Sequence, residues 1–96
     1  MASKELAELL RELRESKGIS LRGAARDLGV DASYLSRVER GDKKASPSVL
    51  DRAANYYELP REDFAFAEGK LPSDIVEILR SHPDLVRQLR QNYGRG

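Results

Sequence analysis

The chain has 96 residues, no cysteine and a formal net charge of only +1, which suits one compact domain with a small appendage. The absence of cysteine excludes disulfides and thiolate metal sites, and the low net charge argues against nonspecific coating of nucleic acid. Because no apolar run approaches the roughly 20 residues of a membrane span and the N-terminus lacks a signal-peptide pattern, we expect a cytoplasmic protein with no membrane partner.

The first predicted element is a helix from Ser3 to about Lys17. Its leucines recur at the i, i+3, i+4, i+7 spacing of a single buried stripe, with charged residues between them. These leucines are Leu6, Leu9, Leu10 and Leu13. Gly18 follows and is expected to close the helix.

The next stretch, from Ser20 to Gly41, predicts two short helices joined by a tight turn. Ser20 is an N-cap type residue, and the helix that it begins places one apolar stripe on a single face: Leu21, Ala24, Ala25 and Leu28. Gly29 is expected to end this helix, because glycine enters the left-handed conformation without steric cost. Asp31 is expected to cap a second helix over residues 32–40.

The combination of these residue types in register resembles the helix-turn-helix family of phage Cro and lambda-type repressors, the xenobiotic-response-element type. A small residue at the helix crossing, a glycine, an apolar turn residue and two inward apolar positions carry the likeness. The full set is Leu21, Ala24, Ala25, Leu28, Gly29, Val30, Leu35, Val38, Glu39 and Gly41. The resemblance extends from about Leu6 to Phe64 and implies a DNA-binding regulator of transcription.

Two more helices complete the predicted domain. Ser46 is expected to cap the fourth, with Pro47 at its first position, where the missing amide proton is no loss. The apolar stripe of this helix is Leu50, Ala53, Ala54 and Tyr57. A short fifth helix follows Pro60, with Phe64 closing the core. The sequence and the resemblance together predict an all-α fold, with a five-helix lambda-repressor-like helix-turn-helix domain over residues 1–67.

Residues 68–96 predict a C-terminal extension of two additional helices, from Pro72 to Ser81 and from Pro83 to about Asn92. An amphipathic helix beyond a finished core needs a surface against which to bury its apolar face. We expect self-association, through Ile75, Ile78, Leu79, Leu85, Val86 and Leu89. The alternative is that the two helices fold back on their own domain.

The helix over 32–40 is the predicted recognition helix, since an α-helix fits the major groove, where each base pair shows a distinct set of donors and acceptors. Residues that point away from its apolar underside are expected to contact bases: Ala32, Ser33, Tyr34, Ser36 and Arg37. Arg37 is the first candidate, because arginine can bind guanine O6 and N7 with two hydrogen bonds. The Tyr34 hydroxyl is ambiguous, since it suits a phosphate, a base or a partly buried surface position.

Residues expected to contact phosphates flank this helix, and they are Ser20, Arg22, Arg40, Lys43, Lys44 and Ser46. Leu21 stands where many members of the family carry a phosphate-binding glutamine, so Ser20 or Arg22 is expected to replace that contact. Gly23 is also unusual, since glycine costs about 1 kcal/mol in a helix interior. It either permits close approach to DNA or merely weakens the helix.

The resemblance also implies a structural ion pair between Arg14 and Glu39. A planar guanidinium can bind a carboxylate bidentately and would link the first helix to the recognition helix. The alternative for Arg14 is an ordinary solvent-exposed arginine.

One such module offers few base contacts, so we expect a homodimer, acting as a repressor on a near-palindromic operator in double-stranded DNA, with recognition helices roughly 34 Å apart. The alternative is a protein-interaction adaptor or antitoxin built on the same fold, which the low net charge and Leu21 favour. Catalysis is not expected, because His82 is the only histidine and no nucleophile has an evident base. No cofactor and no metal site is predicted.

Overall fold

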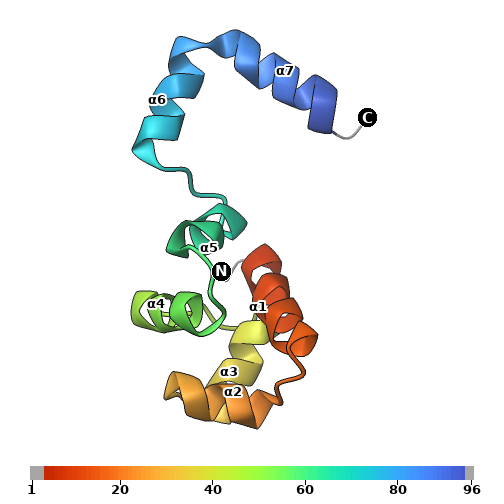
Figure 1. The fold of residues 1–96 in the computed structure, drawn as a ribbon, viewed down its shortest axis with the longest axis vertical. Helices are drawn as coiled ribbons and strands as arrows, with labels where there is room; N and C mark the ends of the chain where they lie inside the picture. Colours follow the sequence, from red (N-terminus) through yellow and green to blue (C-terminus); the bar gives the residue numbers. More distant parts are fainter. Residues whose placement is uncertain (1–3, 95–96) are drawn as a thin grey trace.

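The computed structural model describes residues 4–94, which form seven α-helices and no strand. The helices are α1 (Lys4–Ser16), α2 (Leu21–Leu28), α3 (Ala32–Glu39), α4 (Pro47–Tyr56), α5 (Arg61–Ala67), α6 (Ser73–Ser81) and α7 (Pro83–Tyr93). Figure 1 shows α1–α5 gathered in one cluster, from which α6 and α7 extend as an arm. The predicted all-α fold class, with five helices followed by two more, is confirmed.

The helix ends lie close to their predicted positions. The predicted start of the first helix, at Ser3, lies outside the described residues, and α1 ends at Ser16. The recognition helix α3 ends at Glu39, with Arg40 as its C-cap, one residue earlier than predicted. In the arm, α6 begins at Ser73, after Pro72, and α7 continues to Tyr93.

The core is formed by α1–α5, with Ala45 from the loop between α3 and α4 and Tyr57, the C-cap residue of α4. Phe64 of α5 and Leu35 of α3 are its largest fully buried side chains. The predicted stripes of α2 and α4 also face this core, because their apolar residues recur at helical spacing. Its buried members are Leu6, Leu10, Ala24, Ala25, Leu28, Leu35, Val38, Ala45, Leu50, Ala53, Ala54, Tyr57 and Phe64.

The turn between α2 and α3 depends on Gly29. This residue has a φ of +74°, and the next amide, that of Val30, donates to the Ala25 carbonyl at 2.9 Å. A Cβ at position 29 would lie 3.0 Å from a guanidinium nitrogen of Arg52, so both conformation and space favour glycine. Asp31 occupies the N-cap position of α3, but its side chain makes no capping hydrogen bond, which corrects the predicted cap.

Two polar contacts hold α4 against α2. Arg52 Nη1 donates to the Leu28 carbonyl at 2.6 Å, and the Tyr56 hydroxyl donates to Asp27 Oδ2 at 2.6 Å. The hydrogen bond to Asp27 is the main reason that the pKa of Tyr56 is raised. These contacts join α2 to the middle and to the C-terminal end of α4.

The arm is organised differently from the cluster. Helices α6 and α7 pack against each other, neither makes more than marginal contact with α1–α5, and neither contains a buried residue. The large apolar side chains that are exposed among the described residues all lie from residue 66 onward: Phe66, Leu71, Ile78, Leu89 and Tyr93. The alternative that these helices fold back on their own domain is therefore wrong for this structure.

Candidate nucleic-acid interface

Helix α3 has two distinct faces. Leu35 and Val38 lie on the underside, only 2% and 3% exposed, where α3 packs against α1 and α2. Ser33 and Arg37 lie on the opposite face and are exposed. The two polar side chains are one helical turn apart, so they point from the same side of α3 and are free to reach a groove.

The other three predicted base-contacting residues are less accessible. Ala32 and Ser36 are half-buried at the edges of the exposed face. Tyr34 is also half-buried and packs against the core. Its hydroxyl accepts a hydrogen bond from the Ser46 amide at 3.1 Å, so the hydroxyl oxygen already forms one hydrogen bond within the protein.

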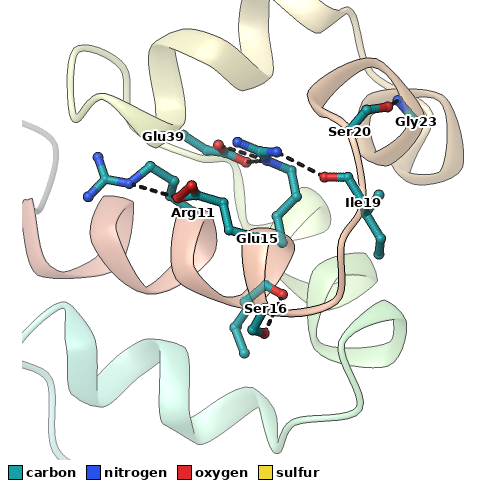
Figure 2. Close-up of polar contacts among 9 residues, drawn as sticks. Arg11, Glu15, Ser16, Ile19, Ser20, Gly23 and Glu39 are labelled. Atoms are coloured by element: carbon teal, nitrogen blue, oxygen red, sulfur yellow. Dashed lines mark hydrogen bonds and ion pairs between the residues drawn. The ribbon is translucent and has the colours of Figure 1, made fainter.

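An ion pair ties α3 to α1. Arg14 Nε donates to both carboxylate oxygens of Glu39 at 3.0 Å, and Arg14 Nη1 donates to the Ile19 carbonyl at 2.9 Å. The dashed lines that end on Glu39 and Ile19 in Figure 2 mark these bonds. Both bonds to Glu39 come from one nitrogen, rather than from the two nitrogens of a fork. The Nη1 group is therefore available to fix the loop after α1.

This ion pair is largely buried. The Glu39 side chain is 5% exposed and the Arg14 side chain 16%. The hydrogen bond to Glu39 raises the pKa of Arg14, against the opposing effect of burial. A carboxylate this deeply buried depends on its partner, so the pair holds the C-terminal end of the recognition helix in place.

Burial of Glu39 changes the charge that the surface presents to solvent. Between residues 37 and 44 the side chains that remain exposed are four cations, Arg37, Arg40, Lys43 and Lys44, and a single carboxylate, Asp42. Arg40 lies 3.6 Å from Asp42 in an exposed pair, which contributes little to stability. The exposed end of α3 and the loop after it are therefore basic, although the whole chain is nearly neutral.

The predicted phosphate contacts at the two N-caps also have internal roles. Ser20 Oγ accepts from the Gly23 amide at 3.0 Å, and Ser46 Oγ accepts from the Val49 amide at 3.3 Å. A Cβ at Gly23 would lie 3.0 Å from Ser20 Oγ, so the glycine gives the cap room. Arg22 is exposed beside Ser20, whereas Leu21 is half-buried against the core.

The structure also brings together residues that no spacing pattern connects. An open hollow of about 600 Å³ lies where the α2–α3 turn, α3 and the start of α4 converge, and both Tyr34 and Ser46 line it.

The buried Tyr57 hydroxyl has no hydrogen-bond partner among the described residues, and burial raises the pKa of Tyr57 to about 12. Helical periodicity predicted that Tyr57 faces inward, but it carries no information about which polar atoms it meets.

Within residues 4–94 no helix is both long and apolar enough to cross a membrane. The same residues contain no group of three His, Cys, Asp or Glu side chains placed to hold a metal ion.

Comparisons with known proteins agree on one family. A family model described as "Helix-turn-helix domain" matches residues 5–67. The HTH-type transcriptional regulator DdrOP3 of Deinococcus deserti is 29% identical over an alignment that covers 93% of this chain and 74% of that protein. Uncharacterized HTH-type transcriptional regulators of Mycobacterium tuberculosis are 36% identical over 70 residues, and the chain spans only 50% of their length.

Solved structures agree with this assignment. The clp gene regulator ClgR from Corynebacterium glutamicum superposes with a TM-score of 0.63 at 25% identity, over 99% of this chain and 97% of that one. SinR, described as the master regulator for biofilm formation and solved in complex with DNA, gives 0.57 at 27% identity, over 62% and 95% of the two chains. These relatives are regulators of transcription rather than enzymes. The chain therefore belongs to the helix-turn-helix domain family, of the Cro and lambda-repressor type.

Proposed function

We propose that this protein is a sequence-specific regulator of transcription, acting as a repressor, that inserts α3 into the major groove of its operator. The observation that carries this proposal is the two-sided character of α3. Its underside is locked into the core, while Ser33 and Arg37 point outward beside a basic loop. The DNA complex of SinR supports the same use of the fold.

Within this interface we assign direct reading of bases to the exposed face of α3. Arg37 is the principal candidate, since its guanidinium is exposed and can bind guanine bidentately. Ser33 shares that face, and Ala32 and Ser36 lie at its edges, where short side chains suit contacts to base edges or to a thymine methyl. Substitution of these residues is expected to alter sequence preference.

The flanking residues are assigned to the DNA backbone. Lys43 and Lys44 follow α3, and Arg40 caps its end, so these cations are placed to neutralise phosphates on one side of the groove. Arg22 and the capping serines of α2 and α4, Ser20 and Ser46, supply further polar groups. Such contacts set the register of the helix on DNA without reading sequence.

We propose that residues 1–67 form the DNA-binding domain and that residues 68–96 form the dimerisation element. The concentration of exposed apolar side chains from Phe66 onward supports a second copy as the partner of the arm. A symmetric dimer presents two recognition helices to a near-palindromic site, which gives the selectivity that one module lacks.

Selection of bound sequences from a random pool of DNA duplexes tests the function directly. The full-length protein is expected to enrich one short inverted repeat, with affinity that falls steeply as salt is raised, because bound phosphates release counterions. Recovery of a single half-site would contradict the dimer. Failure to shift any duplex at low salt would contradict DNA binding and favour an adaptor or antitoxin.

The dimer has its own test in sedimentation equilibrium. The double variant Ile78→Asp, Leu89→Asp places charges among the exposed apolar side chains of the arm and is expected to be monomeric. Gln88→Asp adds one such charge at an exposed polar position of α7 and is expected to leave the dimer intact. Equal association of both variants would show that the arm is not the interface.

A further inference from the structure

Tyr34 makes contacts that set it apart from its neighbours on α3. Its hydroxyl accepts a hydrogen bond from the Ser46 amide at 3.1 Å. This bond connects the first half of the recognition helix to the N-cap residue of α4, 12 positions later. The ammonium of Lys43 lies 6.0 Å from the centre of its ring, within cation–π range. One side chain therefore meets both the middle and the end of the loop that joins α3 to α4.

The Ser46 amide needs such a partner. At the start of α4, Ser46 Oγ caps the Val49 amide, and Pro47 has no amide hydrogen to satisfy. A glutamate or glutamine at the third helical position would return a hydrogen bond to the cap amide, as in a capping box, but this position holds Val49. Tyr34 supplies the missing acceptor from another helix.

We propose that Tyr34 is a positioning residue, which holds the α3–α4 loop and its cations at a fixed place beside the recognition helix, and does not read bases. The hydroxyl fixes the end of the loop through Ser46, and the ring face attracts Lys43. The phosphate-contacting cations are thereby ordered before DNA arrives. Preordered contacts lose less conformational entropy on binding, so affinity rises for every sequence alike.

This inference rests on the proposed DNA binding, and the two hypotheses for Tyr34 differ in a measurable ratio. A positioning residue changes the affinity for the selected duplex and for a random duplex by the same factor. A base-reading residue changes the affinity for the selected duplex alone. The variant Tyr34→Phe removes the hydroxyl and keeps the ring, so it isolates the bond to Ser46.

The experiment measures dissociation constants of Tyr34→Phe for the duplex recovered by selection and for a random-sequence duplex. Both are expected to rise by about 2- to 10-fold, the loss of one hydrogen bond, with their ratio unchanged. The matched control is Tyr56→Phe, which removes a hydroxyl bonded to Asp27 away from the loop and is expected to leave both constants at the wild-type values.

A second measurement on the free protein reports the bond itself. Hydrogen exchange of the Ser46 amide is expected to be faster in Tyr34→Phe than in the wild type or in Tyr56→Phe. A fall in the specific-to-random ratio, unchanged affinity, or unchanged exchange at Ser46 would each overturn the positioning role. A wild type that binds neither duplex would overturn the proposed function, and this inference with it.

Discussion

The five-helix cluster and the C-terminal arm use similar amphipathic helices to opposite effect. In the cluster, apolar stripes of α1–α5 converge on a core whose central side chains, such as Phe64, are fully buried. In the arm, α6 and α7 show equally clear apolar faces, yet no residue of either helix is buried. A helix pattern therefore identifies an apolar face, but does not identify what covers it.

The same contrast extends to polar groups. The ion pair Arg14–Glu39 is largely buried and joins residues 25 positions apart on two helices, whereas the arm pair Arg80–Glu77 is exposed and local. Matched substitutions in the two regions should therefore differ in their consequences.

The largest difference is expected for leucine truncation. Leu35→Ala removes a side chain that is 2% exposed and should lower the free energy of unfolding by about 2–5 kcal/mol, from lost burial and a residual cavity. Leu89, which is 50% exposed, should lose less than about 1 kcal/mol on the same change. Urea denaturation, at a concentration where sedimentation shows a monomer, measures both. Equal losses would mean that the arm is part of the cooperative core.

The ion pairs give the next largest difference. Arg14→Ala leaves the Glu39 carboxylate buried without its partner and should cost about 3 kcal/mol. Arg80→Ala breaks a pair whose side chains are 75% and 71% exposed, so the free energy of unfolding should change by less than about 0.5 kcal/mol. Thermal and urea unfolding of the two variants measure both changes in the free energy of unfolding. A tolerant response to Arg14→Ala would indicate that water reaches Glu39.

At neutral pH the smallest difference concerns two tyrosines. The Tyr57 hydroxyl is buried with no partner among the described residues, so Tyr57→Phe should be neutral or slightly stabilising at pH 7. Tyr93→Phe, at an exposed position of the arm, should have no measurable effect. Marked destabilisation by Tyr57→Phe would show that this hydroxyl forms a hydrogen bond in solution.

Alkaline pH should reveal the same burial. The pKa of Tyr57 is raised from 10.0 to about 12 in the folded chain, chiefly by burial, so the unfolded chain releases this proton first as pH rises. Stability from the neutral phenol is thus complete below pH 10 and is lost between about pH 10 and 12, by roughly 3 kcal/mol at most. Tyr57→Phe should flatten this pH dependence relative to the wild type. Equal slopes for the variant and the wild type would contradict the account.

Much of the cluster was predictable, because its signals are local. Helical spacing of apolar residues, capping serines and Gly29 predicted the order of the helices and their ends to within one or two residues. The family resemblance implied the contact between Arg14 and Glu39, and the structure places these side chains 3.0 Å apart. The recognised family is confirmed by the match over residues 5–67.

The remaining details depend on how distant segments meet. The Tyr34 hydroxyl at the Ser46 amide, and Arg52 at the Leu28 carbonyl, join a side chain to a backbone atom on another element. Such bonds leave no spacing pattern in the sequence, since any residue can supply the backbone atom. The direction of the arm was equally invisible, because an amphipathic helix has the same pattern whether it covers its own domain or another chain.

The central claim is that the exposed face of α3 reads bases through Arg37. Its most direct test is the ratio of dissociation constants for the selected duplex and a random duplex, measured for wild type, Arg37→Ala and Lys44→Ala. Arg37→Ala should reduce this specificity ratio by about 5- to 150-fold, corresponding to roughly 1–3 kcal/mol of discrimination. Lys44→Ala should weaken both complexes alike and leave the ratio unchanged. An Arg37→Ala protein that keeps the wild-type ratio would contradict the claim.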